Sequence, residues 1–141
     1  MTKINAHIST EKEKLDPSVI HAFLTTSYWA TGISLERVKK RIDNSLCFGV
    51  YVEGKQVGFA RLITDYDSFA YLADVFILAD YRGNGLSKQL MAFMLNHPDV
   101  QGLRRWILAT KDAHGLYAQY DFKELAIPSR WMELFNPHSI A

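Results

Sequence analysis

The chain has 141 residues, of which 48% are hydrophobic and 22% charged, and its formal net charge at pH 7 is +1. These values predict one globular domain over residues 1–141 with a core of its own. Lysines and arginines are scattered, so no surface for nucleic acid is expected. No apolar run approaches the roughly 20 residues that a membrane span needs, and the N-terminus lacks the apolar stretch of a secretory signal, so we expect a cytoplasmic protein.

Strand-like and helix-like periodicities alternate along the chain. Asp16 before Pro17 is typical of a helix start, as is Ser34 before the second helix, and Glu53-Gly54-Lys55 predicts a tight hairpin turn. The expected strands are 4–9, 46–53, 56–64, 69–78, 106–110 and 131–135, and the expected helices are about 17–27, 34–42, 86–96 and 113–120. This order predicts an α/β, layered α+β fold, with a mixed central sheet of about six to seven strands flanked by four helices.

Three side chains outside any motif are expected in the core. Cys47 is the only cysteine of the chain and lies in an apolar run, which predicts a buried, unreactive thiol. Trp106 and Trp131 fall in expected strands and are predicted to be buried there.

The segment from Tyr81 to Lys88 lies between an expected strand and an expected helix and contains two glycines. Glycine has no Cβ, so it allows a tight turn and a close approach to a ligand. The helix that follows presents unpaired N–H groups and the positive end of its dipole to an anion. The segment therefore predicts a phosphate-binding loop, with an ordinary strand-to-helix turn as the alternative. It completes neither a Walker motif nor a dinucleotide fingerprint, because Gly85 is followed by Leu86-Ser87 and Lys88 stands at the third glycine position.

This loop resembles the acyl-CoA-binding loop of the GNAT family of N-acetyltransferases, Arg/Gln-x-x-Gly-x-Gly/Ala. Arg82, Gly85 and Ser87 fall on its three defined positions, and Ser87 stands where the family usually has Gly or Ala. Downstream, residues 116–122 resemble the Leu-Tyr-x-x-x-Gly-Phe signature of the last helix of the family, with Asp121 in place of Gly. The resemblance covers essentially the whole chain and implies a GNAT-like acyl-CoA N-acyltransferase fold.

The resemblance implies an enzyme that transfers an acetyl group from acetyl-CoA to a primary amine of a small molecule, by direct attack on the thioester. A catalytically silent acyl-CoA-binding regulatory module and a protein or peptide N-acetyltransferase are the alternatives. Acetyl-CoA is the co-substrate, no metal is implied, and a homodimer is left open.

The acetyl-CoA site is expected in two parts. Backbone N–H groups of the loop would face the pyrophosphate, and the pantetheine would lie along the strand before the loop, where one N–H group would also stabilise the oxyanion. Arg82 and Lys88 would add positive charge, unless Lys88 lies on a solvated helix face. The residues assigned to this site are Val75, Phe76, Ile77, Arg82, Gly83, Asn84, Gly85, Leu86, Ser87 and Lys88.

Tyr117 matches the tyrosine that serves as general acid in the family. A phenol with a pKa of about 10 can donate a proton to a thiolate held in contact with it. Packing in the core is the alternative for Tyr117, and Tyr120 is the alternative acid.

Asp74 is expected to contact the substrate amine or to relay its proton, because a charge in an otherwise apolar strand is costly unless it is solvated or paired. The alternative is an ion pair with Arg61 or Lys111. His114 is a less favoured base. The loop residues Tyr28 and Trp29 are expected to form a wall of the acceptor site, or else to seal the helix pair onto the sheet.

Overall fold

The computed structural model describes residues 4–139. Its strands form one sheet in the order β1-β2-β3-β4-β5, so that neighbours along the chain are neighbours in the sheet. The first four strands are antiparallel, and β5 is parallel to β4. The strands are β1 (His7–Ser9), β2 (Leu46–Val52), β3 (Lys55–Thr64), β4 (Phe69–Ile77) and β5 (Arg105–Leu108).

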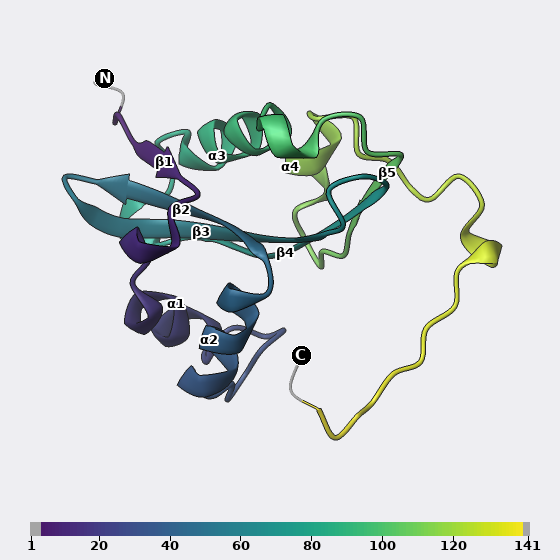
Figure 1. Ribbon diagram of the computed structural model, residues 1–141, viewed down its shortest axis with the longest axis horizontal. Coiled ribbons are helices and arrows are strands. Elements are labelled where there is room, and N and C mark those ends of the chain that lie inside the picture. Colours follow the sequence, from purple (N-terminus) through teal and green to yellow (C-terminus); the bar gives the residue numbers. More distant parts are fainter. Residues whose placement is uncertain (1–3, 140–141) are drawn as a thin grey trace.

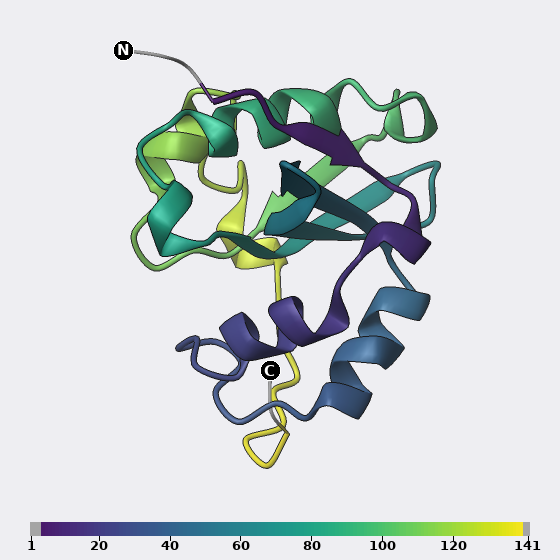
Figure 2. The same ribbon diagram turned by 90° about the vertical axis from the view of Figure 1, so that its left-hand side faces the viewer.

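Helices cover both faces of this sheet. The α-helices are α1 (Pro17–Leu24), α2 (Leu35–Asp43), α3 (Leu86–Leu95) and α4 (His114–Ala118). Figures 1 and 2 show α1 and α2 against one face, and α3 against the other. Because α3 connects β4 to β5, the chain crosses over and the two strands can run parallel.

Local signals in the sequence fix several of these boundaries. The Asp16 carboxylate accepts a hydrogen bond from the N–H of Ser18 at 3.0 Å, and the Ser34 hydroxyl accepts one from the N–H of Arg37 at 3.2 Å, so each caps its helix as expected. Gly54 has a φ of 78° in the turn between β2 and β3, a conformation that glycine adopts without strain.

The predicted α/β class with a mixed sheet and four helices is confirmed, but the predicted number of strands was wrong, since five form instead of six to seven. Residues 131–135, expected to be the last strand, lie outside the sheet because no neighbouring strand pairs with them in the described part of the chain. Trp131 is accordingly exposed and not in the core, whereas Trp106 is half-buried against the core. Other predicted elements have different bounds. Strand β1 and helices α1 and α4 are shorter than predicted, and β5 spans residues 105–108 instead of 106–110.

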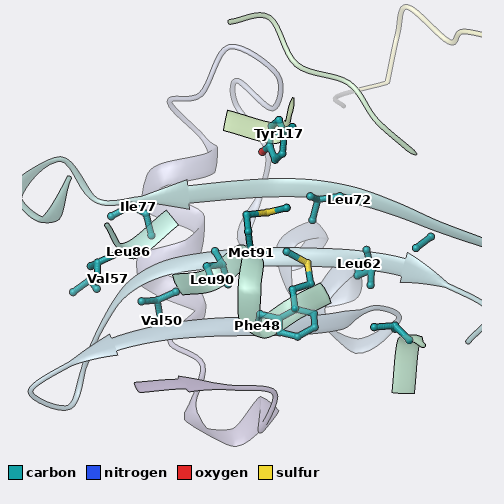
Figure 3. Close-up of a cluster of buried hydrophobic side chains, with 14 residues drawn as sticks. Phe48, Val50, Val57, Leu62, Leu72, Ile77, Leu86, Leu90, Met91 and Tyr117 are labelled. Atoms are coloured by element: carbon teal, nitrogen blue, oxygen red, sulfur yellow. The ribbon is translucent and has the colours of Figure 1, made fainter. Parts of the chain in front are cut away.

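Alternate residues of the strands fill two apolar clusters, one on each face of the sheet. Phe48 belongs to the α3-side cluster and its neighbour Cys47 to the α1/α2-side cluster, as the period of two in a strand requires. The α3-side cluster, drawn in Figure 3, includes Val50, Leu62, Leu72, Leu90, Met91 and Tyr117. The α1/α2-side cluster includes Ile20, Leu24, Val38, Ile42, Phe59 and Phe76.

A β-bulge interrupts β4 in its middle. One extra residue of β4 lies between the pairs Arg61–Ala73 and Phe59–Phe76, which join β3 to β4. Leu72 and Phe76 would share a face in a regular strand, yet Leu72 packs in the α3-side cluster and Phe76 in the α1/α2-side cluster. The bulge thus turns the strand over between these two positions.

Two features are absent from the described residues. No helix within residues 4–139 is both long enough and apolar enough to cross a membrane. In the same range no three His, Cys, Asp or Glu side chains are grouped so that they could hold a metal ion.

Candidate active site

Strand β5 lies beside β4 only over the first half of β4. Their pairing runs from Phe69–Arg105 to Leu72–Leu108, and β4 then continues to Ile77 without β5 beside it. A cavity of about 420 Å³ lies beyond the last pair. Its polar and aromatic lining residues are Tyr28, Trp29, Arg41, Arg61, Tyr71, Asp74, Thr110, Lys111, Asp112 and Tyr117.

Asp74 is the residue at the bulge. Its φ of 54° lies in the left-handed region, which Asp adopts more often than most residues other than glycine. Its buried carboxylate accepts a hydrogen bond from Arg61 Nε at 2.7 Å on one oxygen and from Trp29 Nε1 at 2.9 Å on the other. Arg41 Nη1 lies 3.9 Å from the same oxygen as Arg61. The carboxylate is therefore paired, and each oxygen keeps a lone pair for one further donor.

The charges around the cavity are mostly positive. The side chains of Arg41, Arg61 and Lys111 line it together with those of Asp74 and Asp112. Burial lowers the pKa of Arg41 from its usual value, and the carboxylate of Asp74 opposes this effect. An arginine stays protonated under such a shift. The Asp74 carboxylate therefore lies between two positive charges, Arg41 on α2 and Arg61 on β3.

Tyr28 and Trp29, in the loop between α1 and α2, both line the cavity, and Tyr28 reaches across it to the segment after β5. Their rings are in an edge-to-face arrangement, with centroids 5.1 Å apart. The Tyr28 hydroxyl accepts a hydrogen bond from the backbone N–H of Lys111 at 3.2 Å, and Lys111 Nζ lies 5.4 Å from the centre of the Tyr28 ring. These contacts join the loop to the opposite side of the cavity, so the aromatic pair forms one of its walls.

Tyr117 lies on α4 and lines the same cavity from the α3 side. Its ring is buried in the α3-side cluster, at the margin of the group shown in Figure 3, and contacts the Phe122 ring at a centroid distance of 5.9 Å. Burial raises the pKa of Tyr117, and the nearby phenol of Tyr28 adds to the effect. The phenol therefore stays protonated at neutral pH and is available as a proton donor.

The two alternative residues lie elsewhere. The hydroxyl of Tyr120 donates a hydrogen bond to the carbonyl of Lys88 at 3.1 Å, so this side chain joins the end of α4 to α3. His114 is exposed and lines a neighbouring cavity on the outer side of β5. Lys111 contacts Tyr28 and makes no ion pair with Asp74.

The glycine-containing loop has a defined conformation before α3. Gly83 and Gly85 have φ values of 79° and 76°, and Gly85 is the N-cap of α3. Arg82 Nε donates to the carbonyl of Ile77 at 2.9 Å, which fixes the loop to the end of β4. The Asn84 amide donates to the carbonyl of Tyr81 at 3.1 Å and closes the turn.

An anion with a phosphate group fits this loop. No side chain caps the first N–H groups of α3, so they are free to donate. A Cβ built at Gly83 or Gly85 meets no atom within 4 Å, which means that the loop borders open space. Leu86 is buried under the helix start, whereas Ser87 is half-buried and Lys88 exposed. The positive end of the helix dipole thus faces an open, donor-rich surface.

The structure brings together the candidate catalytic and acceptor residues that the sequence singled out. Asp74, Tyr117 and the aromatic pair line one cavity, and the ion pair between Asp74 and Arg61, weighed as an alternative, is present. Sequence reasoning did not place Arg41 in the site. The sequence does contain one indication of this position. Arg41 precedes the core residue Ile42 on an amphipathic helix and lies three residues after the core residue Val38, so this cation is expected near the buried side.

Comparison with known proteins agrees with this geometry. The sequence matches the Acetyltransferase (GNAT) family over residues 13–122. A solved structure from Xanthomonas campestris pv. campestris, described as belonging to the GNAT family, is 50% identical and has a TM-score of 0.94, and the match covers 96% of each chain. A Gibberella zeae relative that bears an acetyltransferase name is 29% identical over 135 residues, which is 79% of this chain and 75% of the relative.

A more distant structure shares the fold alone. It comes from Clostridium acetobutylicum, contains acetyl-CoA, and is 14% identical with a TM-score of 0.67, over 93% of this chain and 95% of its own. The family match spans most of the sequence. The chain therefore belongs to the GNAT family and is an acyl-CoA-dependent N-acetyltransferase.

Proposed function

We propose that this enzyme transfers an acetyl group from acetyl-CoA to the primary amine of a small molecule. The observation that carries the proposal is the size of the acceptor cavity, together with the aromatic wall beside it. Its volume of about 420 Å³ lies in the range of small-molecule sites. The contacts of Tyr28 with Lys111 join the α1–α2 loop to the segment after β5 at the border of the cavity, which restricts the space for a folded protein substrate.

The donor would occupy the surface formed by the second half of β4 and the start of α3. Beyond Leu72 the strand has no neighbour on the β5 side, so its backbone is accessible to pantetheine. Backbone groups of Val75, Phe76 and Ile77 are proposed to bind the pantetheine. The N–H groups from Gly83 to Lys88 would donate to the pyrophosphate. The acetyl-CoA in the Clostridium acetobutylicum structure, which shares this fold, supports acetyl-CoA as the donor.

In the proposed reaction the amine, once deprotonated, attacks the carbonyl carbon of the thioester. A backbone N–H group at the exposed edge of β4 stabilises the oxyanion of the tetrahedral intermediate. The intermediate then collapses, the C–S bond breaks, and Tyr117 donates a proton to the leaving thiolate. The raised pKa of Tyr117 supports this role, because its phenol remains protonated until the thiolate forms.

Asp74 is proposed to accept a hydrogen bond from the substrate ammonium. Each of its oxygens already accepts one hydrogen bond from the protein, from Arg61 or from Trp29. These two donors fix the carboxylate, and the remaining lone pairs can orient the amine. The proton of the ammonium would then leave through this carboxylate or through water beside it.

A thiol-release assay with acetyl-CoA tests the proposal. Release of free CoA is measured with small primary amines, polyamines, amino acids and peptides, each at matched concentration. We expect turnover with at least one small amine, and none when the amine is replaced by the corresponding alcohol. Turnover with peptides alone would show that the acceptor is a polypeptide. Binding of acetyl-CoA without turnover on any acceptor would favour the silent regulatory module.

A further inference from the structure

A further cavity, of about 640 Å³, is lined by α2, by the turn that follows it and by β3. Arg41 and Arg61 line this cavity and the acceptor cavity alike, so the two adjoin at these guanidinium groups. Four of its lining residues are basic, and we call it the cationic cavity after them. They are Arg37, Lys40, Arg41 and Arg61.

Three of these cations lie on one face of α2. Arg37, Lys40 and Arg41 are three and four residues apart, which is the spacing of neighbours on a helix surface. Within residues 4–139 the ammonium of Lys40 forms no ion pair. Arg37 Nη2 donates to the hydroxyl of Ser139 at 3.4 Å, an exposed contact of little energy. Positive charge on this face is therefore available to a ligand in the cavity.

The opposite side of the cationic cavity holds donors that are already fixed in place. Arg61 is largely buried, and it donates from Nε to Asp74 and from Nη1 to the hydroxyl of Ser45, at 3.2 Å. Ser45 is buried, and its hydroxyl accepts this bond and keeps its own proton for a further acceptor. A guanidinium held at two nitrogens offers its charge from a fixed position, and salt screens a buried charge poorly.

The two adjoining cavities carry a net positive charge. Five cationic and three acidic side chains are among the described residues that line them, which leaves a net charge of +2. The charge of Asp74 is already offset, since one of its oxygens lies 2.7 Å from Arg61 Nε and 3.9 Å from Arg41 Nη1. A substrate whose only charges are ammonium groups would be repelled here. A substrate that also carries an acid group would supply the missing negative charge.

We propose that the acceptor is an amine that also bears a carboxylate or a phosphate group. This acid group binds in the cationic cavity beside Lys40 and Arg41, while the ammonium meets Asp74. The inference rests on the proposed function, because it names the class of acceptor. Arginine binds either acid group through two parallel N–H bonds, and lysine binds it as a point charge. A small molecule can span both places because the two cavities adjoin.

Amide NMR spectra of the labelled enzyme, saturated with CoA so that the phosphate loop is filled, test the acid site without turnover. Each acidic amine is compared with a partner that lacks the acid, namely O-phosphoethanolamine with ethanolamine, and β-alanine with β-alaninamide. An acidic amine is expected to shift the amides of residues 37–45, with a Kd at least about tenfold below that of its neutral partner. The two pairs show whether the cavity prefers phosphate or carboxylate.

Reversal of one charge on α2 locates the acid group. Lys40→Glu should raise the Kd for the acidic amine by about tenfold and leave that for its neutral partner unchanged. Lys39→Glu is the matched control, because Lys39 is exposed and lines neither cavity. Each substitution places a glutamate four residues from an existing acid, Glu36 or Asp43, so the two affect the helix alike. The control should bind as the wild type does.

Thiol release with the same four compounds separates this inference from the proposed function. Acidic amines that bind at α2 when no amine is acetylated would contradict the proposed function and support the acid site. Equal Kd values within both pairs, equal effects of Lys39→Glu and Lys40→Glu, or no shift of residues 37–45 with either acidic amine would overturn the inference. Acetylation of the neutral amines would in that case still support the proposed function.

Discussion

The Arg61 Nε atom lies 2.7 Å from an oxygen of Asp74, inside the bulge that turns β4 over. Both side chains are largely buried, so loss of the Asp74 charge would leave the Arg61 guanidinium without its partner. Trp29 donates to the second carboxylate oxygen from the loop that walls the cavity. This pair thus connects the sheet, the bulge and the acceptor loop, and a change at Asp74 is expected to affect both stability and substrate binding.

Asp74→Asn tests the two roles separately. Loss of the charge leaves the Arg61 guanidinium buried without its partner, so the free energy of unfolding should fall by about 3 kcal/mol and the melting temperature by roughly 10 °C. If Asp74 also meets the ammonium, KM for the amine should rise by about tenfold, while KM for acetyl-CoA changes little. Thermal melts and the two KM values measure these effects.

The control for Asp74→Asn is Asp67→Asn. Asp67 is an exposed carboxylate in the turn before β4, and its removal changes the net charge equally without touching the cavity. It should leave both melting temperature and kinetics nearly unchanged. A destabilised Asp74 variant with an unchanged amine KM would assign this residue to the scaffold alone.

Tyr117→Phe should lower kcat by roughly 10²-fold, the scale of a lost general acid, while the affinity for acetyl-CoA stays the same. Phenylalanine keeps the ring that packs in the α3-side cluster, so the melting temperature should hardly change. Tyr120→Phe is the matched control, because its hydroxyl bonds to the carbonyl of Lys88 and not to the cavity. Wild-type turnover by the Tyr117 variant on a confirmed acceptor would mean that another residue or water protonates the thiolate.

Features with a local cause could be predicted from the sequence. Asp16 and Ser34 cap helices through hydrogen bonds to residues two or three positions away, and Gly54 allows a turn within its own backbone. The glycine loop and Tyr117 were found in the same way, since a short motif carries each of them.

Features that depend on strand pairing could not be predicted so well. The bulge at Asp74 is defined by its register against β3. In the sequence Leu72 and Phe76 fit one face of a regular strand, and only the structure shows that they lie on opposite faces. Residues 131–135 have the apolar pattern of a strand, but a strand also needs a neighbour, and the sequence does not show whether that neighbour lies in the same chain.

The pKa of Cys47 gives the unfolding free energy a pH dependence with a defined sign. Burial raises the pKa of this thiol from 9.0 to about 11. Above pH 9 the unfolded chain loses the proton while the folded protein keeps it, so the contribution to stability is complete below pH 9 and is lost as the pH rises to about 11. The loss should reach about 2 to 3 kcal/mol.

Urea unfolding of the wild type and of Cys47→Ala across this pH range measures the effect. Burial raises the pKa of Tyr51 to about 12. This phenol and the other ionisable groups are the same in both proteins, so the difference between the two curves isolates Cys47. We expect this difference to shrink as the pH rises. A constant difference would contradict the raised pKa. The folded wild type should also react slowly with thiol reagents at neutral pH.

Gly85→Val should abolish binding of CoA, and Gly102→Val provides a control for the backbone strain. Both glycines have a φ of 76°, and a Cβ at either position meets no atom within 4 Å, so each substitution forces a β-branched residue into the left-handed region without a clash in the core. The strain should cost about 1 to 3 kcal/mol of stability in each case.

The two positions differ in what lies beside them. Gly85 caps α3 at the proposed pyrophosphate site, whereas Gly102 lies in the turn before β5. The valine at position 85 would displace the N–H groups of the helix start and place methyl groups in the open space in front of them. The Kd for CoA should therefore rise by at least about 10²-fold in Gly85→Val and stay unchanged in Gly102→Val, as measured by titration calorimetry on folded proteins. Equal affinities in two variants of equal stability would remove the start of α3 from the donor site.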